Sequence, residues 1–299
     1  MIIEAPKKPL VVSDGTTATD YGYRYGRWEQ ERDVPPILRG RHLKNHRTAN
    51  ASLVPWETTW ADGGSGTHPA SRLGLVEDCI FENAGAGYTG PAGTGQFNLA
   101  VGLRGTYRRF VGLAAAWNGL WTGGMSSDPR GGCYRSLIEH FRLERQIRGI
   151  YIEHDTWGSV FRNYAVEATE VGVVSEWAYY EPERDKIGGS GFNLHDGFVI
   201  DLTRAPRGAL GFNLQPGVIG DVIQNGYVVS PYPDDAHIEL PVRLIEPRAM
   251  VEEDYRTALH PNVVRNVIHV DSRPETPQEK RCKPANVTHT DKAIGWSGE

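Results

Sequence analysis

The chain is poor in cysteine, in net charge and in long apolar runs, and each shortage excludes a class of protein. Its 299 residues hold 3 cysteines, and no Cys-x-x-Cys or Cys-x-x-His spacing points to a disulfide framework or a zinc site. A formal net charge of -5 supplies no cationic field for phosphates, which argues against a dedicated nucleic-acid binder. Because no apolar run reaches the roughly 18 residues that a membrane-spanning helix needs, we expect no membrane insertion.

Motifs of the familiar enzyme classes are also missing. The sequence has no Gly-x-Ser-x-Gly, no His-Glu-x-x-His and no Walker-type phosphate loop. The glycines around Gly85 lack the strand-to-helix context of a dinucleotide-binding turn. We therefore predict neither a cofactor nor a bound metal. The first residues lack the basic-then-apolar order of a secretory signal, which predicts that the protein is not exported by that route.

A repeat is the strongest positive feature of the sequence. The stretch at 136–144, followed by 149–153, reappears 23 residues later at 159–167, followed by 172–176. Upstream, Thr106 stands 13 residues before Gly119, and Ser136 stands the same distance before Gly149. Partial copies on both sides extend the repeat over roughly residues 74–229. A fixed period of this kind indicates a stack of similar structural units.

The repeating unit predicts strands. It holds short alternating stretches of Val, Ile, Phe and Tyr, and no apolar stripe with helical spacing. Units of this length with short strands and tight bends are typical of a parallel β-helix, an all-β solenoid, whereas the spaced leucines of leucine-rich repeats are absent. We expect about six to eight coils over 71–230, an N-terminal cap or attachment segment over 1–70, and an irregular C-terminal segment over 231–299 for capping or inter-subunit contact.

Residues that tolerate unusual backbone angles mark the expected bends. Asparagine enters the left-handed region more readily than other non-glycine residues, so stacked asparagines predict a ladder at one bend. The residues expected at that register position are Asn83, Phe110, His140, Asn163 and Asn225. Three glycines, which we expect at a corner that a Cβ atom would obstruct, are Gly119, Gly149 and Gly172.

Two glutamates are the candidate catalytic pair. Glu153 and Glu176 share a register position one repeat apart, and stacked strands lie about 4.8 Å from each other. Carboxyls about 5 to 5.5 Å apart suit a retaining glycosidase, and their repulsion would raise one pKa. The alternative is a solvated pair relieved by an arginine such as Arg148 or Arg162. Glu144 and Glu167 stack by the same argument, which weakens the case for any one pair. Such a ladder also has the oxygen ligands that Ca²⁺ takes, although no loop has an EF-hand pattern.

Histidines near the bends are a further possibility for acid–base chemistry. His140, His154 and His195 lie there, and Asp155 and Asp196 follow two of them. Adjacent residues of a strand point to opposite faces, so each His–Asp neighbour is poorly placed for direct pairing. We interpret these histidines as structural.

Aromatic residues between 117 and 180 are the stronger indication of binding. Sugar rings stack on exposed aromatic faces, while carboxylates and arginines bind the hydroxyl groups. The alternative is that these rings fill the core or a subunit interface. The predicted glycan-binding residues are Trp121, Tyr151, Trp157, Trp177, Tyr179 and Tyr180.

The segment Gly149-Ile-Tyr-Ile-Glu-His154, followed one repeat later by Gly172-Val-Val-Ser-Glu-Trp177 and a proline-containing insert, resembles right-handed β-helix proteins of the bacteriophage minor tail and tail-spike type. These share the coil pattern of the pectate-lyase-like superfamily. The resemblance implies a structural virion component at the tail tip, a homotrimer that contacts other tail proteins and host cell-surface polysaccharide and sometimes cleaves it. Two alternatives remain: a polysaccharide-active enzyme (lyase, hydrolase or epimerase), in the cytoplasm or secreted, and a cytoplasmic sugar isomerase of the same fold.

Overall fold

The computed structural model describes fifteen stretches of the chain: 11–14, 23–24, 37–44, 53–54, 75–83, 97–101, 105–114, 118–122, 133–152, 156–175, 180–181, 186–187, 190–215, 218–241 and 261–290. Over these residues the protein is all-β, and its one helical element is a short 3-10 helix, η3 (Gln278–Lys280). Most strands pair in parallel, and most belong to one large sheet.

Three rows of parallel strands make up the stack. The first row is, in order, β1 (Val11–Asp14), β4 (Arg41–Lys44), β6 (Leu75–Glu82), β8 (Thr106–Leu113), the first half of β11 (Leu137–Ile152), the first half of β13 (Val160–Ser175), β17 (Leu194–Asp201), β19 (Val222–Ser230) and β21 (Val263–Asp271). The second row is β7 (Phe97–Val101), β9 (Asn118–Thr122), the second halves of β11 and β13, β18 (Leu210–Leu214), β20 (Ile238–Pro241) and β23 (Val287–Thr290). The third row is β10 (Cys133–Tyr134), β12 (Thr156–Trp157) and β16 (Ser190–Gly191).

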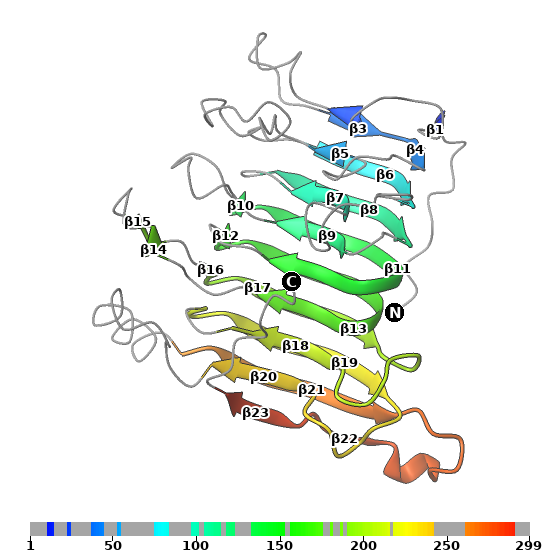
Figure 1. Cartoon of the computed structure of the whole chain (residues 1–299), viewed down its shortest axis with the longest axis vertical. Helices are drawn as coiled ribbons and strands as arrows, with labels where there is room; N and C mark the ends of the chain where they lie inside the picture. Colours follow the sequence, from blue (N-terminus) through cyan, green and yellow to red (C-terminus); the bar gives the residue numbers. More distant parts are fainter. Residues whose placement is uncertain are drawn as a thin grey trace.

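A few strands lie outside these rows. β3 (Ile37–Arg39) pairs with β6, and β2 (Tyr23–Arg24) pairs with β5 (Leu53–Val54). Two pairs are antiparallel: β22 (Cys282–Pro284) with the end of β21, and β14 (Tyr180–Glu181) with β15 (Lys186–Ile187). The reversal at β22 folds the chain back at the end of the first row (Figure 1).

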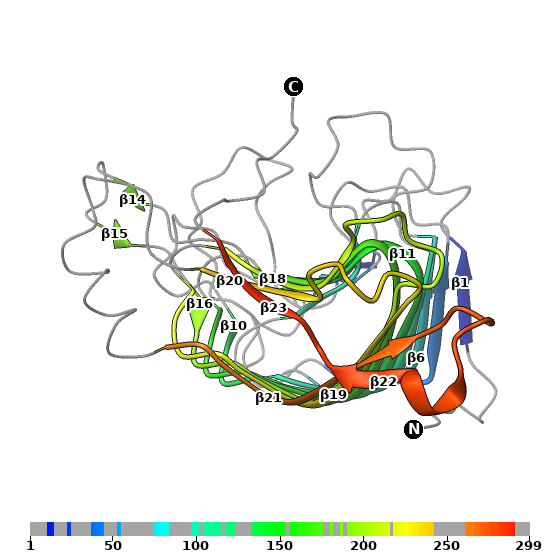
Figure 2. The same ribbon diagram turned by 90° about the horizontal axis from the view of Figure 1, so that it is seen from below.

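Successive repeats superpose when the stack is viewed along its length (Figure 2), and this arrangement is compatible with a β-helix-like fold. Parallel pairing also reaches beyond the predicted central segment, because β4 pairs with β6 and β19 pairs with β21. The division into segments 1–70, 71–230 and 231–299 stays a prediction.

One bend of the first row has the left-handed backbone that the sequence predicted, but with a different set of residues. All seven have φ between 52° and 69°: Asp78, Arg109, His140, Asn163, Gly197, Asn225 and Asn266. The prediction was wrong for Asn83, which lies at the following bend, and for Phe110, which is in the core. The asparagine ladder is interrupted, as the residues other than asparagine at this position predict: Asn266 Nδ2 donates to Asn225 Oδ1 (3.2 Å), while the side chain of Asn163 lies over Gly197. At this position the repeats share a backbone conformation but not a residue type.

Aromatic rings stack inside the rows because equivalent positions of neighbouring repeats lie directly above one another. The ring centroids of Phe110 and Phe141 are 4.9 Å apart, those of Phe141 and Tyr164 are 5.0 Å apart, and Phe198 continues the column at 5.7 Å. All four side chains are fully buried. Such columns contribute packing energy beyond the area they bury.

Glycines allow the second row to pack closely. A Cβ atom on Gly149 would lie 2.4 Å from the carbonyl oxygen of Gly172, and one on Gly172 would lie 2.7 Å from that of Gly211. A Cβ on Gly119 would lie 3.0 Å from the oxygen of Gly149. The prediction that a side chain would be obstructed at these three positions is confirmed.

A row of buried polar side chains, here called the polar row, precedes the strands of the first row. In each repeat a backbone N–H donates to a side-chain oxygen of the next repeat. The five bonds run from Gly105 to Ser136 (3.1 Å), Ser136 to Ser159 (3.2 Å), Ser159 to Asn193 (3.0 Å), Asn193 to Asp221 (2.8 Å) and Asp221 to Asn262 (2.9 Å). Side chains thus continue the backbone ladder where the chain enters each strand.

Asp221 is the only carboxylate in the polar row over the described residues. It is fully buried, its Oδ1 accepts the Asn193 N–H, and its Oδ2 has no hydrogen-bond partner. Burial raises the pKa of this carboxyl to about 7, although the hydrogen bonds from Asn193 oppose the shift.

We predict that Asp221→Asn removes a pH dependence of stability. The folded protein holds a proton at Asp221 that the unfolded chain releases near pH 4, so the free energy of unfolding falls by about 1.4 kcal/mol per pH unit between pH 4 and 7. The amide keeps the Oδ1 acceptor and cannot ionise. Urea unfolding at pH 5 and pH 7.5 should show a smaller fall in the free energy of unfolding for the variant than for the unmodified protein. Asp201→Asn serves as the control. An unchanged pH dependence of the free energy of unfolding would mean that Asp221 is ionised in the folded protein.

Candidate functional site

The connections between the second and third rows differ in length, and this bend is here called the insert bend. Residues Thr122, Ile152 and Ser175 are in register at the end of the second row, and Cys133, Thr156 and Ser190 are in register at the start of the third. The intervening segments are 123–132, 153–155 and 176–189. Since variable loops on a regular scaffold carry binding and catalytic residues in many proteins, this bend is the first place to look for function.

Buried hydroxyl pairs tie the ends of these inserts to the stack. Ser175 Oγ lies 2.6 Å from Ser190 Oγ, so the two ends of the 176–189 insert meet. Thr122 Oγ1 lies 3.1 Å from Thr156 Oγ1 of the next repeat. All four residues are buried. An insert can therefore vary in length while its base stays fixed. The β14–β15 hairpin belongs to the longest insert and stands away from the stacked strands (Figure 2).

The two candidate catalytic glutamates belong to these inserts. Glu153 and Glu176 lie outside the described residues, so their separation stays a prediction. The residues directly before them, Ile152 and Ser175, are Cα partners in the pairing of β11 with β13. Two arginines were considered as cations that offset the repulsion of this pair. Arg148 pairs instead with Glu170 (2.8 Å), and Arg162 pairs with Glu139 (2.6 Å).

Each member of the second carboxylate pair has an arginine of its own. Glu144 pairs with Arg142, and Glu167 pairs with Arg204 at 3.1 Å. The pairing of β11 with β13 shifts register between Leu143 and Gln146, so Glu144 and Glu167 are not Cα partners. Each carboxylate has its own cation, as expected for solvated surface charges.

The predicted glycan-binding aromatics occupy different environments. Trp121 and Tyr151 alternate with the core residues Leu120 and Ile150, so they face away from the core, yet they are only 7% and 3% exposed. Trp177 and Tyr179 lie outside the described residues. Tyr180 is described only as part of the backbone of β14. Trp157, on β12 directly after an insert, is half-buried.

Trp157 forms an aromatic pair with Phe192, a residue that the sequence analysis missed. Their ring centroids are 6.3 Å apart, and Phe192 is 49% exposed. Phe192 has φ of 54° at a register position that Gly158 and Gly220 occupy in neighbouring repeats. A bulky side chain in the left-handed region costs stability, and such strained residues cluster at functional sites. The signal was a phenylalanine where the register expects glycine, which is visible only once the register is known.

Arg135 completes this surface. It occupies the same left-handed row as Phe192, with φ of 52°, and its backbone N–H donates to the carbonyl of Trp157 (2.9 Å). Its side chain is exposed and makes no ion pair with any residue in the described stretches. These three residues lie two or three positions after an insert, at the end of the third row. We call Arg135, Trp157 and Phe192 the aromatic surface.

Arginines on the first row are neutralised by acidic neighbours. Glu77 accepts from Arg108 (2.8 Å) and from Arg109 (2.7 Å), and it also pairs with Arg39. Arg265 donates to Gln224 (2.7 Å), which in turn donates to Asp196 (3.0 Å). These charges are satisfied along the stack, so they offer less attraction to an outside anion than Arg135 does.

Of the two candidate histidines that the structure describes, His195 is structural. His195 is buried, stacks on Phe161 at 4.7 Å and shares a hydrogen bond with the hydroxyl of Tyr164 (3.0 Å). Burial lowers the pKa of His195 to about 3. Asp196 points to the other face and accepts from Asn225 (2.7 Å), so the two neighbours are not paired, as predicted. His140 is exposed, and His154 with Asp155 lies outside the described part of the chain.

Comparisons with models of protein families, with curated protein sequences and with solved structures found no match to this chain. Within the described stretches no helix has the length and apolar character needed to cross a membrane. Those same stretches contain no group of three or more His, Cys, Asp or Glu residues positioned to hold a metal ion.

We predict that Phe192→Gly changes the free energy of unfolding by less than about 1 kcal/mol, because relief of the left-handed strain offsets the lost contact with Trp157. The control is Phe198→Ala, which empties part of the core and should cost about 3–5 kcal/mol. Urea denaturation measures both. A loss at Phe192 as large as that at Phe198 would show that the exposed ring is a structural element.

Proposed function

We propose that the protein is a structural component of a virion tail, built as a right-handed parallel β-helix, which binds host cell-surface polysaccharide at the insert bend. The observation that carries the binding proposal is the aromatic surface: Phe192 is half-exposed at a strained backbone position and pairs with Trp157, and the exposed Arg135 occupies the same register position two repeats away. The ring packs against Trp157 and over Gly220, yet half of the residue stays exposed. A ligand that stacks on the exposed ring would account for the strained backbone conformation of Phe192.

A sugar chain suits this surface. Apolar faces of pyranose rings pack on aromatic side chains, and a guanidinium donates to hydroxyl or carboxylate oxygens of the same sugar. The variable inserts at the bend would supply the specificity. The β-helix geometry is supported by parallel rows in which strands of successive repeats superpose (Figure 2). The virion location, the neighbouring tail proteins and the homotrimer rest on the sequence resemblance.

The binding proposal predicts that Phe192→Gly and Trp157→Ala each weaken binding to host-envelope polysaccharide by about threefold to tenfold, which corresponds to one lost ring contact. Tyr227→Ala is the matched control, because Tyr227 is 48% exposed on β19 and is not part of the aromatic surface. Titration calorimetry with purified polysaccharide measures binding, and light scattering on the same samples gives the oligomeric state. Equal binding by all three variants would overturn the proposed site.

A polysaccharide-active enzyme is the second candidate, favoured by the pairing of Ile152 with Ser175 directly before Glu153 and Glu176. If this function is correct, Glu153→Gln and Glu176→Gln each reduce cleavage by at least a hundredfold, because the acid or the nucleophile is lost. Gel filtration of the polysaccharide after incubation detects shortened chains. Cleavage that persists in both variants would exclude this pair, and intact polysaccharide with the unmodified protein would favour the structural function.

A further inference from the structure

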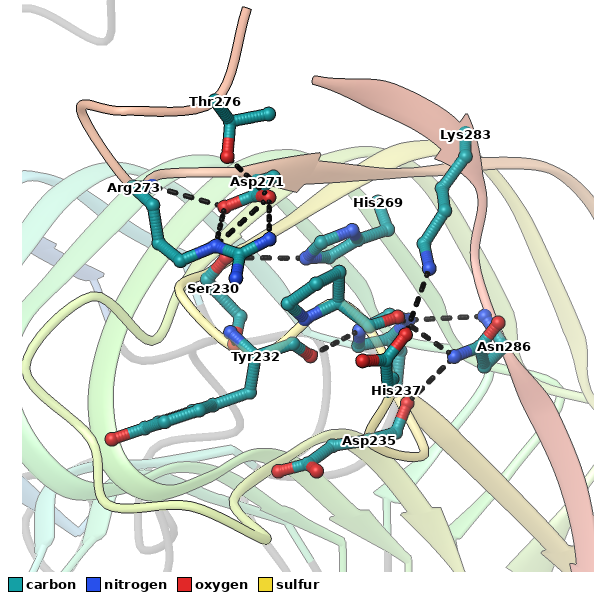
Figure 3. Close-up of polar contacts among 12 residues, drawn as sticks. Ser230, Tyr232, Asp235, His237, His269, Asp271, Arg273, Thr276, Lys283 and Asn286 are labelled. Atoms are coloured by element: carbon teal, nitrogen blue, oxygen red, sulfur yellow. Dashed lines mark hydrogen bonds and ion pairs between the residues drawn. The ribbon is translucent and has the colours of Figure 1, made fainter. Parts of the chain in front are cut away.

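Two buried histidine rings lie face to face where the second row ends. His237 directly precedes β20, and His269 is on β21. Their ring centroids are 4.0 Å apart and their planes differ by 5° (Figure 3). The residues are 1% and 0% exposed. No function described above uses this pair.

The hydrogen bonds around the pair fit only neutral rings. The backbone N–H of Asn286 donates to His237 Nδ1 (3.0 Å), so this nitrogen must be unprotonated, while His237 Nε2 donates to the carbonyl of Tyr232 (3.3 Å). His269 Nε2 donates to the carbonyl of Ser230 (3.2 Å), and its Nδ1 is buried without a hydrogen-bond partner. A proton added to His237 Nδ1 would face the Asn286 N–H, donor against donor. A proton added to His269 Nδ1 would have no acceptor.

Charged residues surround the pair on several elements. The cations are Lys283 on β22 and Arg273 after β21, and the anions are Asp234, Asp235 and Asp271. Asp271 is held by Arg273 through bonds of 2.6–3.1 Å and by Thr276 at 2.8 Å, which keep the pKa of this carboxyl well below its usual range. Its charge is therefore constant in mild acid. Protonated rings would repel one another and also repel Lys283.

Asn286 connects the histidine pair to the last strand of the second row. Besides the bond to His237 Nδ1, its carbonyl accepts from the N–H groups of His237 (3.0 Å) and Ile238 (3.1 Å). Its side-chain amide donates to the carbonyls of Pro233 (3.0 Å) and Asp235 (2.9 Å). The next residue begins β23, which pairs in parallel with β20. Loss of the Asn286 contacts would therefore loosen β23 at its first residue.

We propose that the stacked His237–His269 pair is an acid-sensitive latch, and that protonation of both rings releases β23 from β20. The closed state accepts only neutral rings, whereas the open state exposes them to water and accepts a proton on each. The latch shares no residue with the aromatic surface, so the test of the latch does not depend on the proposed glycan binding.

The direction of the pH effect follows from the pKa values. Burial, together with the neighbouring His269 and Lys283, lowers the pKa of His237 to about 4, and burial also lowers the pKa of His269. Open rings titrate near 6.5. The latch is therefore closed above pH 6.5. Between pH 6.5 and 4, proton uptake by His237 raises the opening equilibrium about tenfold per pH unit, and proton uptake by His269 steepens the rise.

Hydrogen exchange read by mass spectrometry tests the latch on the full chain between pH 7 and 4, with rates corrected for intrinsic pH dependence. Peptides covering 282–290 should lose protection with a pH dependence that corresponds to the uptake of two protons. Peptides covering β13 and β17 should stay protected. Simultaneous loss in both regions would mean global unfolding and would overturn the proposal. Those control peptides include His195, the buried histidine of the core.

Variants separate the latch from general acid sensitivity. His237→Asn keeps an acceptor near Nδ1, and His269→Gln keeps a donor near Nε2, so each should reduce the steepness to one proton and the double variant should stay closed at pH 4.5. His289→Gln, on an exposed histidine of β23, should leave the profile unchanged. If the histidine variants do not fold, Lys283→Gln provides the test: without this cation the closed rings accept protons more readily, so opening moves to lower pH. An unchanged midpoint in both the double variant and Lys283→Gln would overturn the latch.

Discussion

In-register parallel hydrogen bonding is the constraint on which the rest of this structure depends. Where strands of successive repeats pair without a shift, as they do outside the irregularity between Leu143 and Arg148, each residue lies above its equivalent, and equivalent residues form a row. Phe110, Phe141, Tyr164 and Phe198 become a column of rings, and the residues before the strands become a relay of side-chain acceptors. The same constraint requires glycine where backbones approach closely, as at Gly149 and Gly172.

The sequence was informative where one residue type repeats and misleading where only a backbone conformation repeats. Alternating apolar residues gave strands, and the equivalent glycines were aligned correctly. Thr106 was aligned with Ser136, yet Gly105 is the residue whose N–H bonds to Ser136, so the alignment was one residue out. The same error placed Phe110 at the bend and left out Arg109. Left-handed conformations at Asp78 and Arg109 have no side-chain signature that a sequence pattern detects.

Site residues were harder to predict because their meaning depends on three-dimensional register. Trp121 and Tyr151 were predicted to bind glycan because they belong to an aromatic-rich stretch around the inserts, whereas the structure buries them on the side of the second row that faces away from the core. Phe192 became significant only when its register position proved to be one that glycine occupies in the flanking repeats. His237 and His269 come from different repeats in a region without a recognisable period, so nothing in the sequence indicated that their rings stack.

The hydroxyl contact between Ser175 and Ser190 closes the base of a long insert within the width of a single hydrogen bond. A segment of any length that is closed in this way connects the stacked strands as a tight turn would. The scaffold and the loops are thus thermodynamically almost independent, since a change in loop sequence leaves the register of the strands untouched. A chain built in this manner can take a longer, shorter or different segment at one insert while its strands keep their pairing.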